Sequence, residues 1–403
     1  MRFAERMGRL TTAASFDMLA RGKAFEAQGR SIIHLGIGEP DFDTPAYIRE
    51  AANAALAAGY THYGPAAGLP EFRSLIATTW RLRRGLRCEA ANVVVTPGAK
   101  PILFFAMLAL LEAGDEVLIP SPAFPNYVSI AEFLGARVVP VPLLSAHGFD
   151  VDLAALRDRI TPRSRMLLLN SPHNPTGSVL PGATLMAIAE LACRHDLVVL
   201  SDEIYSGMVY EGESPSIATL PGMSERTVVV DGFSKTYAMT GWRMGHAILP
   251  VDLVEPFVRL VINSVSGTSA HQQIAAAEAL DGPQDAVDEM VEEFRSRRDL
   301  IVDGLNAIAG VRCLRPKGAF YVFPDISGTG LTGPEAADRL LNEAGVSVLS
   351  GTAFGKVGAN HLRISYANSR ANITAALERM RAVFEPARES GRLASHRTSS
   401  SRS

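Results

Sequence analysis

Lys235 has a residue type and a position that suit covalent chemistry. It follows the apolar run 228–230 within the sequence Asp-Gly-Phe-Ser-Lys-Thr-Tyr. A lysine amine held in a partly desolvated pocket has a lowered pKa and forms a Schiff base with a carbonyl carbon. Most loop lysines are plain surface cations, so the meaning of Lys235 depends on the residues that accompany it.

Asp202 and Tyr205 follow another apolar run, 198–200. An acid and a phenol three residues apart can hydrogen-bond to two edges of one flat heteroaromatic ring. Such a pair is more often structural, with each side chain satisfied by the other. Pyridoxal 5′-phosphate needs both a lysine for its carbonyl and an acid for its pyridinium nitrogen. Together with Lys235, the pair therefore predicts this cofactor.

A phosphate site is predicted at Gly98, Ala99 and Lys100, which precede a helix expected to start at Pro101. Backbone N–H groups at a helix N-terminus bind anions, and small residues let the backbone approach. Arg243 supplies a fixed charge and forked hydrogen bonds. The alternative is an ordinary strand-to-helix turn.

Five apolar runs end in polar clusters of this kind. They are residues 93–95, 117–119, 166–169, 198–200 and 228–230. In an open parallel sheet, ligands bind beyond the carboxyl ends of the strands. The convergence of five such loops predicts a small-molecule site.

Short apolar runs alternate with helix-length segments from residue 92 onward, which predicts an α/β fold with a mostly parallel seven-stranded sheet. The expected strands are 93–95, 116–120, 137–141, 166–169, 197–200, 227–230 and 247–249, and expected helices include 101–113, 182–195 and 285–308. Later short strands are expected at 318–323, 346–349 and 361–365. We predict a large domain at 46–290, a smaller α+β domain from 1–45 and 291–387, and a disordered Arg- and Ser-rich tail at 388–403.

Composition excludes several function classes. The 403 residues carry a net charge of −3 and 7% aromatics, which argues against nucleic-acid binding. No apolar run reaches the roughly 18 residues of a membrane span. The three cysteines form no CxxC pair, which favours a reducing cytoplasm. No GxGxxG follows an expected strand, Gly-Phe-Ser-Lys-Thr at 232–236 is no GxSxG motif, and the histidines show no HExxH spacing. A dinucleotide, a serine nucleophile and a metal are therefore not expected.

Six motifs in sequence order resemble the class I/II aminotransferases, the aspartate aminotransferase-like pyridoxal-phosphate enzymes of fold type I. The resemblance spans residues 32–384. The motifs are GEPDFDTP (38–45), YTHYGPAAGLPEFR (60–73), NSPHNPTG (170–177), SDEIY (201–205), FSKTYAMTGWRMG (233–245) and LRISYA (362–367).

This resemblance implies roles for individual residues. Lys235 would carry the cofactor as a Schiff base, Asp202 would pair with the pyridinium nitrogen, and Tyr205 would complete the catalytic set. The implied cofactor-binding residues are Gly98, Ala99, Lys100, Phe124, Asn174, Asp202, Tyr205, Ser234, Lys235, Arg243 and Tyr63. The implied substrate-binding residues are Gly38, Phe124, Asn174 and Arg363. Arg363 would clamp the α-carboxylate.

The resemblance also implies a homodimer, because Tyr63 would reach the phosphate of the neighbouring subunit. Two departures concern the phosphate: Gly232 stands where some members have serine, and Pro101 removes a backbone donor. Lys100 has two interpretations. Some members use a lysine there to bind the distal carboxylate of an acidic substrate, and the other interpretation is a phosphate or surface contact.

The predicted reaction is transfer of an amino group from an L-amino acid to a 2-oxo acid in amino acid metabolism or biosynthesis. The nearest alternative is a lyase or synthase reaction on the same scaffold, such as elimination, replacement or cyclisation, since the same side chains serve all of these. A ligand-sensing regulator needs a DNA-binding module, and no helix-turn-helix is expected before residue 32. The identity of the amino donor stays open.

Overall fold

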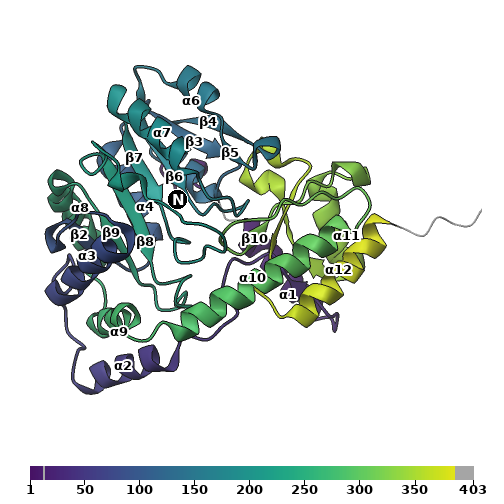
Figure 1. Ribbon diagram of the computed structural model, residues 1–403, viewed down its shortest axis with the longest axis horizontal. Helices are drawn as coiled ribbons and strands as arrows, with labels where there is room; N and C mark the ends of the chain where they lie inside the picture. Colours follow the sequence, from purple (N-terminus) through teal and green to yellow (C-terminus); the bar gives the residue numbers. More distant parts are fainter. Residues whose placement is uncertain (12–13, 386–403) are drawn as a thin grey trace, which may run out of the picture.

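The computed structural model describes residues 1–11 and 14–385, and its largest feature is an open sheet (Figure 1). Among these residues the sheet has eight strands in the order β2-β9-β8-β7-β6-β3-β4-β5. The strands are β2 (Val93–Thr96), β3 (Glu116–Ser121), β4 (Arg137–Leu144), β5 (Asp150–Val151), β6 (Ser164–Asn170), β7 (Val198–Asp202), β8 (Thr227–Gly232) and β9 (Gly245–Ile248). Strands β4, β3, β6, β7 and β8 pair in parallel, whereas β9 and β5 run antiparallel to their neighbours.

The middle residues of the central strands are apolar because both faces of the sheet are covered. Along β3, Val117 and Ile119 pack in a core with α4 (Lys100–Leu110), α5 (Pro125–Phe133) and α8 (Val251–Val265). Leu118 packs in a core with α6 (Leu153–Arg159) and α7 (Gly182–Arg194). Beside this second core, α2 (Ala46–Ala57), α3 (Pro70–Arg84) and α9 (Ala270–Asp281) cover β2, β8 and β9. Successive side chains point to opposite faces of a strand, so one apolar run supplies both cores.

The helices of the described residues are as follows. They are α1 (Ala14–Glu26), α2 (Ala46–Ala57), α3 (Pro70–Arg84), α4 (Lys100–Leu110), α5 (Pro125–Phe133), α6 (Leu153–Arg159), α7 (Gly182–Arg194), α8 (Val251–Val265), α9 (Ala270–Asp281), α10 (Asp285–Asn306), α11 (Gly333–Ala344) and α12 (Arg370–Phe384).

The seven strands expected from the sequence all lie in this sheet, and β5 extends it by one strand. The helix expected at 101–113 ends earlier, at Leu110, because Leu111 already has an extended backbone with ψ of 135°. The helix expected at 285–308 is α10, which ends at Asn306.

Elements from both ends of the chain form a second body around a separate core (Figure 1). Its strands are β1 (Ile33–His34), β10 (Tyr321–Val322), β11 (Val346–Ser347), β12 (Leu349–Ser350) and β13 (Leu362–Ser365). Strand β1 pairs in parallel with β11, and β13 lies between β10 and β12. We propose that residues 14–45 and 291–385 form one domain, with α10 running through its boundary. The tail predicted at 388–403 lies outside the described residues.

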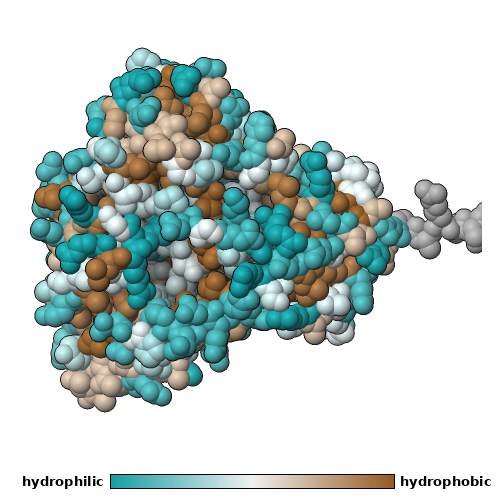
Figure 2. Space-filling model, in the orientation of Figure 1, coloured by the Kyte–Doolittle hydropathy of each residue, from teal (hydrophilic) through white to brown (hydrophobic). Residues whose placement is uncertain are grey.

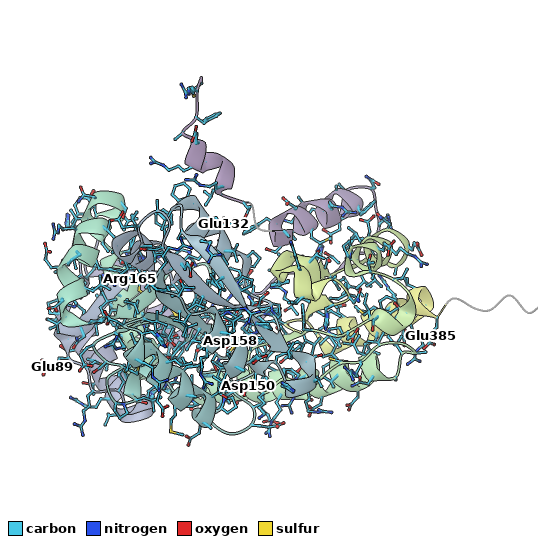
Figure 3. All side chains as sticks on the ribbon, turned by 90° about the horizontal axis from the view of Figure 1, so that it is seen from above. Glu89, Glu132, Asp150, Asp158, Arg165 and Glu385 are labelled. Atoms are coloured by element: carbon cyan, nitrogen blue, oxygen red, sulfur yellow. The ribbon has the colours of Figure 1, made fainter. Side chains whose placement is uncertain are left out.

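The N-terminal segment lies against α5 at the edge of the large body. Its 3-10 helix Glu5–Arg9 buries no residue, and Arg9 donates to the Phe133 carbonyl. Figure 3 shows this segment extending away from the body near Glu132. Its apolar side chains Met1 and Phe3 are exposed.

Hydrophilic residues cover much of α10 on the face shown in Figure 2. Among residues 1–11 and 14–385, no helix has the length and apolar character that a membrane span requires.

Candidate active site

A cavity of about 470 Å³ opens at the carboxyl ends of the parallel strands, where the second body meets the sheet. Eleven of the thirteen site residues expected from the sequence line it. They are Gly38, Ala99, Lys100, Phe124, Asn174, Asp202, Tyr205, Ser234, Lys235, Arg243 and Arg363. The two that do not line it are Gly98, which lies directly behind Arg243, and Tyr63.

Lys235 follows β8 and extends its amine into this cavity. Its Nζ donates to the Gly38 carbonyl at 2.5 Å. Burial, which nearby Glu39 opposes and Arg363 reinforces, lowers the pKa of Lys235 to about 8. At pH 7 roughly a tenth of the amine is then uncharged, far more than for an ordinary lysine, and the uncharged form is the one that acts as a nucleophile or base.

Asp202 is the last residue of β7 and is only 5% exposed. Its Oδ2 accepts from the Tyr127 hydroxyl at 2.7 Å and its Oδ1 accepts from the Ile204 backbone at 3.2 Å. Burial raises the pKa of Asp202 to about 6, and the hydrogen bond from Tyr127 works against this rise. The carboxylate is thus held in one orientation, without a cationic side chain bonded to it in the described residues.

Tyr205 comes from the segment after β7, and its hydroxyl shares a hydrogen bond of 2.8 Å with the Tyr321 hydroxyl. Burial raises the pKa of Tyr205 well above its ordinary value, so the phenol keeps its proton. Asn174 lies nearby in the loop after β6, where its backbone N–H donates to the Asn170 side chain at 2.8 Å. The two groups supply polar contacts to one side of the cavity.

Lys100 and Arg243 place two cations at the start of α4. Neither forms an ion pair with a carboxylate among the residues that the structure describes. Burial lowers the pKa of Lys100, and the positive charge of Arg243 lowers it as well, because the two cations repel each other. Gly98 has φ of +88°, and a Cβ there would overlap the Arg243 guanidinium. The backbone, the helix N-terminus and the two cations together suit a multiply charged anion.

Arg363 is a buried guanidinium, 4% exposed, that lines the same cavity. It donates to the Asn174 side chain at 3.4 Å and to the Gly36 carbonyl, and its Nε has no partner. No described carboxylate pairs with it. A buried cation without a counter-ion is costly, so this arrangement suits an incoming carboxylate bound in a bidentate manner.

Tyr63 lies apart from this group and is 93% exposed. Nothing in its own subunit packs around its side chain, and it does not line the cavity. If Tyr63 contributes to a site, that site belongs to another copy of the chain.

Several lining residues were not predicted from the sequence. Tyr127 and Tyr321 bond to the two predicted side chains Asp202 and Tyr205, and Glu39 contacts Thr240. Glu39 lies inside the GEPDFDTP motif, so the motif itself was the available signal. Tyr127 faces the cavity from α5, and no spacing in the sequence indicates that orientation. The remaining unpredicted lining residues are Ser15, Phe16, Ile37, Leu103, Asn170, Ile204 and Thr240.

The site thus combines an amine of lowered pKa, an oriented carboxylate, an anion site and a free buried guanidinium. Such a set belongs to an α/β enzyme that acts on small amino or oxo acids with the help of a phosphate-bearing group.

Comparison with known proteins agrees. The model of the family "Aminotransferase class I and II" matches residues 30–380. Arginine–pyruvate transaminase AruH of Pseudomonas aeruginosa is 44% identical over 87% of this chain and 90% of its own length. An aspartate aminotransferase of Pyrococcus abyssi is 42% identical over 88% and 92%. The structure of Thermus thermophilus aspartate aminotransferase with maleate has a TM-score of 0.91 and 40% identity, covering 95% of this chain and 100% of that one.

The chain therefore belongs to the class I and II aminotransferases and has their fold. It is an aminotransferase, an enzyme that moves an amino group between an amino acid and a 2-oxo acid. The relatives named above are all transferases of this kind, and none of them supports the lyase or synthase alternative.

Proposed function

We propose that this aminotransferase uses pyridoxal 5′-phosphate, which it binds in the cavity that Lys235 enters. One observation carries the proposal: a half-buried amine of lowered pKa shares a cavity with the oriented carboxylate of Asp202 and an anion site at Gly98 and Arg243. Amine, acid and anion site match the aldehyde, the ring nitrogen and the phosphate of this cofactor.

Each chemical group of the cofactor has residues in the cavity that would bind it. Asp202 would hold the pyridine nitrogen, and Tyr205 and Asn174 would hold the phenolic oxygen. Phe124, whose ring lies 5.4 Å from that of Tyr127, would cover one face of the ring. The phosphate would be bound by Gly98, Ala99, Lys100, Ser234 and Arg243.

When bound, pyridoxal phosphate supplies an aldehyde that condenses with amines and a pyridinium ring that withdraws electrons from the substrate Cα. Asp202 keeps the ring nitrogen protonated, because a nearby negative charge favours the protonated form. Lys235 takes the Cα proton at its Nζ and later returns a proton, acting as base and then acid. Its lowered pKa suits both directions near neutral pH.

Substrate binding is assigned to Arg363, Asn174 and Gly38. Arg363 would meet the α-carboxylate, which supplies the counter-ion that the buried guanidinium lacks. Asn174 already lies within hydrogen-bonding distance of the same guanidinium. All amino and oxo acids carry this carboxylate, so this contact is shared by every substrate.

We propose a homodimer with shared active sites, in which Tyr63 binds the phosphate in the partner's cavity. The support is the exposure of Tyr63 and of the apolar residues Met1 and Phe3 on the N-terminal segment. Apolar side chains on an extended segment commonly mark an interface.

For the amino donor we propose only a class of compound, the amino acids. The relatives' names cover arginine, aspartate and aromatic amino acids, and we propose a role in amino acid metabolism, including biosynthesis. The cysteines Cys88, Cys193 and Cys313 are free, which supports a reducing compartment such as the cytoplasm.

The test is Lys235→Ala with an exposed lysine as control. Lys235→Ala should abolish transamination and leave no cofactor bound covalently after borohydride reduction, while noncovalent cofactor is retained. Lys356→Ala should keep turnover and the reduced cofactor adduct on the peptide that carries residue 235. An adduct on another lysine, or normal turnover of Lys235→Ala, would contradict the assignment.

A further inference from the structure

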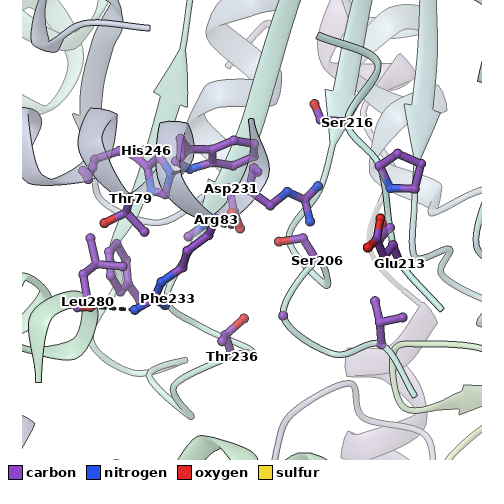
Figure 4. Close-up of a pocket in the computed structure, with 18 of the residues that line it drawn as sticks. Thr79, Arg83, Ser206, Glu213, Ser216, Asp231, Phe233, Thr236, His246 and Leu280 are labelled. Atoms are coloured by element: carbon purple, nitrogen blue, oxygen red, sulfur yellow. Dashed lines mark hydrogen bonds between the residues drawn. The ribbon is translucent and has the colours of Figure 1, made fainter. Parts of the chain in front are cut away.

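A second cavity, of about 560 Å³, lies behind the segment that carries Lys235 (Figure 4). Its walls are the C-terminal half of α3, the loop 206–216 and residues 231–233, 236 and 237. It has no lining residue in common with the active-site cavity. Ser234 and Lys235 face one cavity, whereas Phe233 and Thr236 line the other.

His246 and Asp231 form a polar end of this cavity. His246 is 4% exposed, and its Nε2 accepts from the indole N–H of Trp80 at 2.9 Å. Burial lowers the pKa of His246 to about 3, so the ring is neutral and its proton is on Nδ1. That Nδ1 is buried without a partner, a state that a protein group normally avoids.

Asp231 stands opposite His246 in the register of β8 and β9, and both line the cavity. Its Oδ1 accepts from the Gly232 backbone at 2.7 Å. Burial raises the pKa of Asp231 to about 8, so near pH 7 its carboxyl is largely protonated. A protonated carboxyl can both donate a hydrogen bond to a neutral hydroxyl and accept one from it.

Aromatic side chains form the wall above this polar end. Phe233 and Tyr237 are stacked with ring centroids 5.6 Å apart, and Phe233 also lies 5.8 Å from the His246 ring. Trp80 completes the wall beside His246. Such walls accept a flat apolar body.

The rim of the cavity carries one cation without a carboxylate partner. Arg83 donates to the Leu280 carbonyl at 3.0 Å and forms no ion pair among the described residues. Its neighbour Arg84 is different, because it pairs with the buried carboxylate of Glu203. Figure 4 shows Glu213 across the cavity from Arg83, and its negative charge disfavours a second anionic group.

We propose that this cavity is a binding site for a small aromatic monocarboxylate with a hydroxyl at its far end. Arg83 would bind the carboxylate, the wall of Trp80 and Phe233 would hold the ring, and Asp231 beside His246 would bind the hydroxyl. The volume is in the usual range for a ligand of this size. The site is independent of the reaction proposed above, although its occupant would touch the residues on both sides of Ser234 and Lys235.

The experiment uses 3-(4-hydroxyphenyl)propanoate, which has no amino or oxo group to transfer. The chain has two tryptophans, Trp80 and Trp242, and only Trp80 lines this cavity. In the holoenzyme of Trp242→Phe, Trp80 is the sole tryptophan and reports directly on the site. Titration should change its emission saturably, and the cofactor absorbance reports separately on the active site.

Further substitutions in the Trp242→Phe protein show which of the two cavities binds the probe. Arg83→Gln should weaken the Trp80 titration at least about tenfold, the value of a charged hydrogen bond. Arg81→Gln, an exposed arginine of the same helix that does not line the cavity, should leave it unchanged. Arg363→Lys should weaken only the response at the cofactor.

Three results would overturn the proposal. They are no saturable Trp80 response, equal weakening by Arg83→Gln and Arg81→Gln, and loss of the Trp80 response in Arg363→Lys, which would place the probe in the active site alone. None of them would bear on the transamination reaction, which is tested at Lys235.

Discussion

Asp202 is a carboxyl group that the fold removes from water, and this has a consequence for stability. Burial raises its pKa to about 6, whereas an unfolded chain has about 3.9. The folded state therefore binds the proton more tightly than the unfolded state. Stability falls as the pH rises from about 4 through 6, and the full cost is present above pH 6.

Asp202→Asn should therefore stabilise the cofactor-free protein at pH 8 and have little effect on stability below pH 4. The gain is at most roughly 3 kcal/mol, because each pKa unit corresponds to about 1.4 kcal/mol. Thermal unfolding at both pH values measures it, with the exposed Asp158→Asn as control. In the holoenzyme the same variant should slow Cα deprotonation of an α-deuterated donor by orders of magnitude. A wild-type deprotonation rate would make Asp202 a structural acid only.

Substitutions at Lys100 and Arg363 distinguish the binding of a distal carboxylate from the binding of the α-carboxylate. If Lys100 binds a distal carboxylate, Lys100→Ala should impair dicarboxylic substrates about ten- to a hundredfold and spare monocarboxylic ones. Arg363→Lys should impair both groups by a similar factor, because lysine cannot form the forked pair. Values of kcat/KM for aspartate and for a monocarboxylic donor measure this. An equal loss in Lys100→Ala, with weaker cofactor retention, would assign Lys100 to the phosphate.

At this scale the sequence predicted the residues that carry charge or react, because their types and motifs are distinctive. Lys235 and Asp202 follow apolar runs, and both reach the cavity. Tyr127 and Tyr321 were missed because their role depends on which way a helix face or a short strand points. That orientation is decided by packing between elements far apart in the chain.

The turn between β2 and α4 forms part of the proposed phosphate site. Gly98 has a left-handed backbone, with φ of +88°, and its missing Cβ leaves the space in which the Arg243 guanidinium lies. Arg243 itself is held by a hydrogen bond to the Thr240 carbonyl at 3.0 Å. A side chain at residue 98 would strain the turn and displace the cation together.

Gly98→Ala should therefore weaken cofactor binding at least tenfold, measured as the dissociation constant for pyridoxal phosphate. Gly85→Ala is the matched control, since Gly85 also has positive φ, +70°, but nothing lies within 4 Å of its absent Cβ. Both variants should lose roughly 1–2 kcal/mol of stability from backbone strain. If both bind the cofactor as the wild type does, Gly98 has no part in the phosphate site.

The main elements were predictable because burial on both faces leaves a simple signal. Residues 166–169 and 227–230 are continuous apolar runs, and they form β6 and β8. The two-residue strands β1 and β5 gave no such signal, since two residues define no periodicity. Their pairing depends on partners such as Val346 and Leu143 that only the folded chain brings near.

Positively charged side chains are concentrated in the active-site cavity, although the net charge of the whole chain is −3. The active-site cavity is lined by four cationic side chains and by only two carboxylates, those of Glu39 and Asp202. This local excess suits a phosphate and a substrate carboxylate bound at the same time. Two expected residues do not line the cavity: Gly98 lies behind Arg243, and Tyr63 is exposed on the surface of its own subunit.

A mixture of two impaired variants tests whether Tyr63 acts across a dimer. Lys235→Ala should be inactive, and Tyr63→Ala should bind the cofactor weakly and turn over slowly at limiting cofactor. In a mixed dimer, the site with Lys235 faces a partner that retains Tyr63, so one native site should form. Co-expression with two affinity tags isolates this mixed dimer, and its activity at limiting cofactor should reach about half that of the wild type. If Tyr63 acted within its own subunit, the only site with Lys235 would lack it, and the mixed dimer would be no better than Tyr63→Ala alone.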